Sequence, residues 1–257
     1  MGLFSWWSGK QPTEGEAKCP VDHTKLKPAA DASKCPVDHT KLKGGVNPLN
    51  NMPELSANRA PGQKGALDTE RTFSSIPKGS DASEGVWEYP SPQQMFNAIV
   101  RKGKHADDDE EAVTSMVDVH NFLNEGAWEE ILRWEAKYTA DSGQAPRLLQ
   151  FTGRPNDPSP RALMLQAMGK VFPSKFGIEP PFDRHDWTVQ RALPGGDRAK
   201  VRYVIDYYSG PAEPDGSPSF YLDVRPALDS VTSAHDRFSV WSAAVWEDAM
   251  GKGGRVD

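Results

Sequence analysis

Two cysteines are the first residues of this chain whose type and spacing could do chemistry, because each is followed by proline and, four residues on, by histidine. Cys19 and Cys35 lie in a ten-residue stretch that occurs twice without change, at residues 18–27 and 34–43. Proline fixes its own φ and offers no N–H group, so each thiolate projects from a stiff turn. A sulfur presented in this way could serve as an axial ligand of ferric haem iron.

Two other interpretations of the repeats compete with haem binding. Together with His23 and His39, the two cysteines could hold a tetrahedral zinc ion, although the spacing differs from the usual paired-cysteine pattern. The repeats could also be a duplicated solvated tail that binds nothing. Cys-Pro dipeptides of this kind resemble haem-regulatory motifs, so we favour transient binding of haem iron by Cys19 and Cys35.

His120 is the second candidate, on the apolar face of a predicted helix. It shares that face with Met116, Val117 and Leu123. A histidine there is more often a hydrogen-bonded core residue than a ligand. The alternative is an axial ligand of haem, because a flat apolar disc needs a ligand that emerges from an apolar wall. Asn121, Asn124 and Glu125 are close enough in sequence to orient the ring of such a ligand.

His185 is the third candidate and lies in the string Phe182-Asp183-Arg184-His185-Asp186-Trp187, between two prolines and a predicted strand. The carboxylates of Asp183 and Asp186 favour a charged imidazolium, which could act as an acid or a base. A salt-bridged histidine in a turn is an equally good interpretation.

Aromatic and basic side chains complete the candidate set. A pocket for a flat apolar ligand could be walled by an aromatic set, namely Trp87, Tyr89, Trp128, Trp134 and Trp187, but tryptophan is usually part of a core. Arg184, Arg202 and Arg225 could pair with the carboxylates of such a ligand, although their spacing does not support this role.

The elements that must position these residues can be predicted from the local pattern. Helices are expected from the Ser91-Pro92 start, from the acidic run at residues 107–111, from Asn124 as a separate cap, from Ser159, and over residues 233–250. Strands are expected over residues 148–152, 187–192, 201–208 and 220–224. Strands that follow helices and are joined by short loops indicate an α+β fold, with an antiparallel sheet flanked by helices.

Composition divides the chain into three parts. Residues 1–46 carry almost no large apolar side chains besides those at the extreme N-terminus, and we predict a long disordered arm. Residues 47–84 are predicted to be an extended irregular segment, and residues 85–257 a globular domain. No run approaches the roughly 20 apolar residues that span a membrane. The net charge of −6 argues against a nucleic-acid partner and suits a basic protein partner.

Six separated blocks of the sequence resemble, in order, the cytochrome c-type haem lyase family in its fungal mitochondrial form. They span residues 47 to 230 and read NPLNNMPEL (47–55), WEYPSPQQMFNAIVRKGK (87–104), VHNFLNEGAW (119–128), FPSKFGIEPPFDRHDW (172–187), VRYVIDYYSGP (201–211) and LDVRPALDS (222–230). The paired Cys-Pro-Val motifs upstream are also similar to those of this family.

The resemblance implies a lyase that associates peripherally with the mitochondrial inner membrane, on its intermembrane-space face. It implies that haem b is the substrate and apocytochrome c the partner, with thioether bonds formed between the haem vinyls and the cysteines of a Cys-x-x-Cys-His segment. His120 is then the axial ligand of the haem iron, Glu125 supports haem binding, and His185 is a further catalytic participant. The Cys-Pro-Val motifs would help to deliver or sense haem.

Three rival functions stay open at this point. The first is a lyase for cytochrome c1, whose motifs are shared. The second is a haem sensor or chaperone that binds haem through Cys19 and Cys35 and catalyses nothing. The third is a small zinc-binding interaction protein.

Overall fold

The structure is a computed structural model that describes residues 46–47, 52–53, 55–103, 110–177, 179–214 and 216–249. The contacts divide the chain into two compact units. Of the described residues, the larger unit holds 73–89 and 119–249, and the smaller unit holds those up to residue 72 together with residues 90–118. The repeats that contain Cys19 and Cys35 lie outside the described residues.

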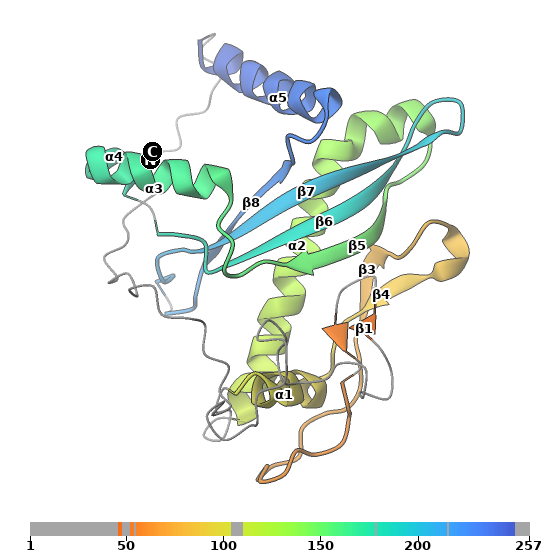
Figure 1. Ribbon diagram of the computed structural model, residues 1–257, viewed down its shortest axis with the longest axis vertical. Coiled ribbons are helices and arrows are strands. Elements are labelled where there is room, and N and C mark those ends of the chain that lie inside the picture. The colour runs from red at the N-terminus through yellow and green to blue at the C-terminus, as the bar shows by residue number, and fades with distance from the viewer. Residues whose placement is uncertain are drawn as a thin grey trace, which may run out of the picture. The chain divides into compact units, whose positions relative to one another are not determined.

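A four-stranded antiparallel sheet forms the centre of the larger unit (Figure 1). Its strands follow one another in the order β5 (Arg147–Gly153), β6 (Asp183–Ala192), β7 (Arg198–Ser209) and β8 (Phe220–Pro226). All four predicted strands are therefore confirmed, and each is longer than the pattern suggested. Six consecutive residues of β7, from Tyr203 to Tyr208, are buried, so both faces of this strand are covered.

The helix α2 (Glu110–Ser142) packs its later turns on one face of the sheet. The indole of Trp134 donates to the carbonyl of Val224 on β8 over 2.8 Å, and Ala127 and Ile131 have no exposed surface. The apolar residues follow the helical period, as predicted. The prediction of two helices with Asn124 as a cap was wrong. The Asn124 amide instead donates to the carbonyl of His120, one turn back, and the helix continues through it.

A hairpin of β3 (Phe73–Pro77) and β4 (Val86–Glu88), with the short helix η3 (Ala82–Glu84) between them, also belongs to this unit. It joins the sheet through a bridge between Lys78 and Leu148. Part of the segment predicted to be irregular, residues 47–84, is thus regular structure. Side chains of β3 are alternately exposed and buried, as in a strand with one face on the core. The strand has only five residues, so this alternation is too short to identify a strand from sequence.

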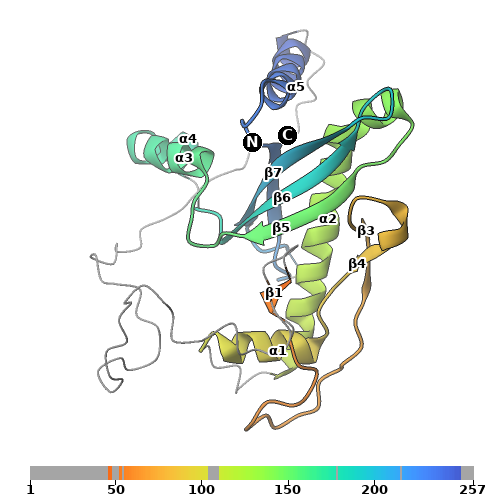
Figure 2. The same ribbon diagram turned by 45° about the vertical axis from the view of Figure 1, so that its right-hand side comes forward.

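The opposite face of the sheet carries polar side chains, over which α3 (Pro160–Val171) begins. Ser159 caps this helix and its hydroxyl donates to Asp206 over 2.5 Å. The four-residue helix α4 (Pro173–Phe176) follows α3, and α5 (Val231–Ala249) follows β8. Figures 1 and 2 show α3 and α4 across the sheet from α2. An α+β fold with helices flanking an antiparallel sheet is therefore confirmed.

The smaller unit contains α1 (Pro92–Arg101), which starts where the sequence predicted. Ser91 and Gln94 form a reciprocal capping box at its first turn. Two short strands, β1 (Val46–Asn47) and β2 (Met52–Pro53), pair in the same unit. Across both units, none of the helices in the described ranges has the length and apolarity needed to cross a bilayer.

Candidate functional site

His120 lies one turn before the sheet-facing residues of α2, so its imidazole is half-buried at the border of the core. Its ring meets the ring of Tyr89 edge-on, with 6.0 Å between the centroids. Asn124, one turn further along the helix, receives a hydrogen bond from the hydroxyl of Tyr207 on β7 over 3.5 Å. The histidine is therefore held between α2, the residue that follows β4, and the central strand β7.

Two asparagines contact the ring nitrogens of His120. The side-chain oxygen of Asn121 lies 3.3 Å from Nδ1, and the amide nitrogen of Asn124 lies 3.2 Å from Nε2 and 3.4 Å from Nδ1. An amide oxygen can only accept, so we assign the proton to Nδ1, with Nδ1–H donating to Asn121. The lone pair is then on Nε2, which is the arrangement that a metal-binding histidine requires.

Burial lowers the pKa of His120 below its ordinary value, since removal from water penalises the charged imidazolium. The hydrogen bond to Asn121 and the charge of Asp183 act in the other direction, and the nearby His185 adds to the lowering. The net effect keeps the imidazole neutral at physiological pH. A neutral imidazole is the form that binds iron.

His185 lies inside β6 rather than in a turn, and it faces the same side of the sheet as Tyr207. Its Nε2 is 3.2 Å from a carboxylate oxygen of Asp183, and its Nδ1 is 3.5 Å from the Tyr207 hydroxyl. The side chain is 16% exposed, so solvent still reaches it. The arrangement gives an imidazole with a carboxylate on one nitrogen, which is the geometry of a proton donor and acceptor.

A cluster of aromatic rings lies beside His185. The ring of Tyr207 lies 5.2 Å from the ring of His185 and 6.2 Å from that of Phe182, which in turn lies 5.9 Å from Phe220. Phe182 is about half exposed. Tyr207 is buried, so Phe182 and Phe220 supply the exposed part of this aromatic wall, against which a flat metal macrocycle such as haem could lie.

Glu125 does not face this wall but ties α2 to the β3–β4 hairpin. Its carboxylate accepts hydrogen bonds from the hydroxyl of Ser74 (2.6 Å), the amide (3.1 Å) and hydroxyl of Ser75, and the hydroxyl of Tyr89 (2.7 Å). Burial alone would raise the pKa of Glu125, but these donors outweigh it and lower the pKa. Because Tyr89 also packs on His120, the carboxylate fixes one wall of the histidine site.

Trp87 and Trp128 are core residues in this structure. The indole of Trp87 donates to the carbonyl of Leu148 over 3.3 Å and packs edge-on against Phe151 at 5.1 Å. Trp128 lies two turns beyond His120 on the sheet-facing side of α2 and is 3% exposed. A direct contact of either indole with a ligand stays a prediction.

The three candidate arginines lie on the far face of the sheet from His120 and have protein partners. Arg184 binds Asp186 at 3.0 Å, Arg202 binds the same carboxylate at 2.7 Å, and Arg225 binds Asp206 at 2.6 Å. The alternation of the strands explains this: even-numbered residues of β6 and β7 point away from α2, and Arg225 on β8 lies opposite Val204 and so shares that face. They do not join the histidine site.

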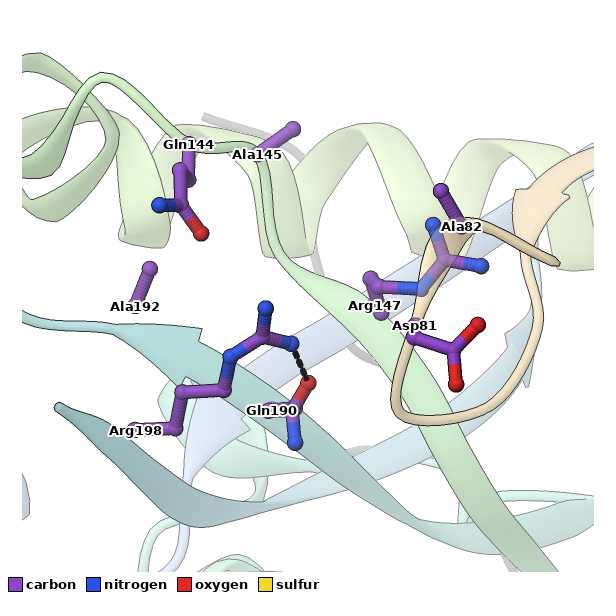
Figure 3. A pocket seen from close by; sticks show the side chains of 8 residues that line it. All are labelled: Asp81, Ala82, Gln144, Ala145, Arg147, Gln190, Ala192 and Arg198. Carbon is purple, nitrogen blue, oxygen red and sulfur yellow. Dashed lines mark hydrogen bonds between the residues drawn. The ribbon is translucent and has the colours of Figure 1, made fainter. Parts of the chain in front are cut away.

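The cavity in Figure 3 is a different feature from the histidine site. It has a volume of about 250 Å³ and is lined by Arg147, Arg198 and Gln144, which lies two residues after the end of α2. His120 lies more than twenty residues earlier, about 30 Å along the helix at 1.5 Å per residue. A cavity this small and charged does not suit a porphyrin.

No grouping of three or more histidine, cysteine or acidic residues able to hold a metal occurs within the described ranges. The zinc interpretation concerns Cys19, His23, Cys35 and His39, which lie outside them. The sequence indicated Tyr89 only as a possible pocket wall, and it missed Tyr207 and Ser74, whose partners are far away along the chain. Tyr207 alternates with polar neighbours in a strand, so its apolar face was visible but its contacts were not.

The sequence matches one protein family and several of its named members. Residues 6–241 match the model of the family described as "Cytochrome c/c1 heme lyase". A Saccharomyces cerevisiae protein named holocytochrome-c synthase is 54% identical over 76% of this chain and 75% of its own length. The human holocytochrome c-type synthase is 41% identical over 76% of this chain and 68% of its own length.

A Schizosaccharomyces pombe relative whose name refers to holocytochrome-c1 synthase is 40% identical over 68% of this chain and 76% of its own length. No solved structure matches the chain. The family match covers most of the sequence, including the segments that carry His120, Glu125 and His185. The chain therefore belongs to the cytochrome c/c1 haem lyase family, whose members are enzymes of the lyase class.

Proposed function

We propose that this protein attaches haem b covalently to apocytochrome c, at the intermembrane-space face of the mitochondrial inner membrane. The observation that carries the proposal is the neutral, half-buried imidazole of His120 beside the aromatic wall. Nε2 of His120 would bind the haem iron from one side, and the histidine of the Cys-x-x-Cys-His segment from the other.

His120 would fix the haem so that each substrate cysteine lies against a vinyl group. Holding two reactants together replaces a bimolecular encounter and can supply much of the acceleration. In each addition, the S–H bond and the vinyl π bond are lost, and one C–S and one C–H bond form. The addition is redox-neutral, and the thiol proton ends on the vinyl carbon.

His185 would move that proton. The imidazole has Asp183 on Nε2 and the Tyr207 hydroxyl near Nδ1, so it can accept a proton from a thiol and return it. Glu125 would act as a positioning residue, because its hydrogen bonds hold Tyr89 against His120. Cys19 and Cys35 would bind haem iron transiently, before it reaches His120.

The test is co-expression with apocytochrome c, scored by covalent haem on a denaturing gel. We expect the wild-type chain to give haem-stained cytochrome c and His120→Ala to give none. His235→Ala is the matched control, because this histidine is exposed on α5. Normal holocytochrome from His120→Ala would end the assignment of the iron ligand.

Cytochrome c1 is the second candidate substrate, because relatives named for both cytochromes match a similar share of the chain. The same assay with apocytochrome c1 separates them. We expect apocytochrome c to be preferred, in line with the higher identity to the yeast holocytochrome-c synthase.

A further inference from the structure

Arg237 on α5 is a half-buried cation, and no described residue forms a hydrogen bond or ion pair with it. It lies among other cations. Partial burial lowers its pKa, and repulsion from Arg225 and Arg161 lowers it further, against the attraction of Asp223. An unpaired guanidinium next to two others is a costly arrangement unless an anion joins it.

The protein carboxylates of this cluster are already used. Asp223 on β8 binds both Arg161 of α3, at 3.1 Å, and Arg225, at 3.0 Å. Arg225 also binds Asp206, at 2.6 Å. The cluster of Arg161, Arg225, Arg237, Asp206 and Asp223 therefore has a net charge of +1. Of its arginines, Arg161 and Arg237 are the ones that solvent reaches.

Exposed apolar side chains flank these two arginines on both helices. Trp241, one turn after Arg237, is 61% exposed, and its ring lies 5.7 Å from that of Phe238, which is 62% exposed. On α3, Met164 is one turn after Arg161 and about half exposed. Residues three and four apart share a helix face, so each arginine lies beside an apolar group.

A cation next to exposed tryptophan and phenylalanine is the pattern of a surface that enters the headgroup region of a bilayer. Tryptophan prefers this region because its ring is apolar and its N–H group is polar. Phosphate oxygens accept readily from guanidinium groups. The excess positive charge gives electrostatic complementarity to an anionic lipid surface.

We propose that α3, β8 and α5 form a binding surface for anionic phospholipid, in which Arg161 and Arg237 bind a lipid phosphate and Phe238 and Trp241 enter the interface. This surface deepens the peripheral membrane contact included in the proposed function, and rests on it. It lies on different elements from His120, so haem binding and lipid binding use separate residues.

The experiment is sedimentation of the full chain with vesicles, of phosphatidylcholine alone or mixed with phosphatidylglycerol. We expect tighter binding to the anionic vesicles, and less binding as salt is added. Arg237→Gln should weaken binding to anionic vesicles about fivefold, the effect of one cation near such a surface. The double variant Phe238→Ala, Trp241→Ala should weaken binding to both kinds of vesicle.

Arg133→Gln, an exposed arginine of α2, is the matched control for charge, and circular dichroism checks that each variant is folded. Equal binding by Arg237→Gln and Arg133→Gln would overturn the proposal, as would equal binding of the wild type to both kinds of vesicle. Protection of Arg237 from chemical modification by inorganic phosphate, without vesicle binding, would also overturn it. The assay contains no haem or apocytochrome, so its failure leaves the lyase assignment to its own test.

Discussion

The amide nitrogen of Asn124 lies 3.2 Å from Nε2 of His120 and 2.7 Å from the backbone carbonyl of the same residue. The amide has two hydrogens and can satisfy both acceptors. The same amide nitrogen makes both contacts, so it covers the lone pair of Nε2 as long as it stays bonded to the carbonyl. Iron could bind Nε2 only if the Asn124 side chain turned away from the ring.

Asn121 should control which nitrogen of His120 binds iron. Asn121→Ala removes the acceptor for Nδ1–H, so the proton is free to move to Nε2 and haem affinity should fall about 10- to 100-fold. Asn121→Asp keeps an acceptor at the same place and should retain affinity. Titration of the purified variants with haem, followed by absorbance, measures this effect. Equal affinity for Asn121→Ala and the wild type would contradict the assigned tautomer.

Haem ligation by His120 should persist in mild acid. The pKa of His120 is lowered from its ordinary value of 6.5, so the imidazole is still neutral when the pH falls to that value. Ligation should be lost only as the pH passes through the lowered pKa. The absorption spectrum of the haem complex, recorded at stepwise pH, gives the midpoint. A midpoint at or above 6.5 would show that burial does not protect this ring.

The parts of the fold that could be predicted are those governed by local pattern. The apolar period of α2, the alternation of β7 and the serine-proline starts of α1 and α3 depend on neighbours in sequence. The hairpin that carries Ser74 could not be predicted in this way. Its function in the fold depends on Glu125, some fifty residues further on, and nothing in the local sequence encodes that contact.

In the candidate site, too, the residues set by local pattern could be predicted and the contacts between distant segments could not. The apolar face of α2 singled out His120, and the adjacent asparagines were visible in sequence. The approach of Tyr89 and of His185 was not visible, because it depends on the register of separate strands. The expectation of a helix cap at Asn124 failed because the same side chain can cap a helix or bond one turn back within it.

Glu125→Gln should lower the free energy of unfolding at neutral pH and make it less dependent on pH in the acid range. The carboxylate has a lowered pKa, so it stabilises the fold above the ordinary value of 4.5, and this contribution is lost as the pH falls through the lowered pKa. At neutral pH the variant should lose about 1 kcal/mol, the net contribution of a typical hydrogen bond, because the donors around Glu125 are partly exposed. Below pH 4.5 its stability should approach that of the wild type.

Denaturant unfolding at stepwise pH tests this prediction, with Glu129→Gln, exposed on the same helix, as the control. A parallel pH dependence for Glu125→Gln and the wild type would mean that the carboxylate is not held by its donors. Haem affinity of the variant should fall as well, since Tyr89 loses its anchor beside His120.

The buried pair of Arg191 and Glu135 should matter for folding and not for chemistry. The guanidinium and carboxylate are 2% and 1% exposed, lie 2.7 Å apart, and bind Tyr203 and Asp236 in addition. Glu135→Ala leaves the buried guanidinium with Asp236 as its remaining carboxylate partner, and breaking such a buried pair costs about 3 kcal/mol. Unfolding should shift to lower denaturant, while the remaining folded protein binds haem with unchanged affinity. Reduced affinity of the folded fraction would place Glu135 in the site.

Cys19 and Cys35, the cysteines of the Cys-Pro-Val motifs, should affect activity only when haem is scarce. If His120 and the haem itself organise the reaction, no cysteine of the enzyme enters the bonds that form, so Cys19→Ala with Cys35→Ala should retain activity when haem is abundant. With haem scarce, the variant should fall behind the wild type, because delivery through the thiolates becomes limiting. Covalent haem on cytochrome c, measured at two haem supplies, separates these cases. Complete loss at abundant haem would make a thiolate part of the reaction and displace His120 from its central role.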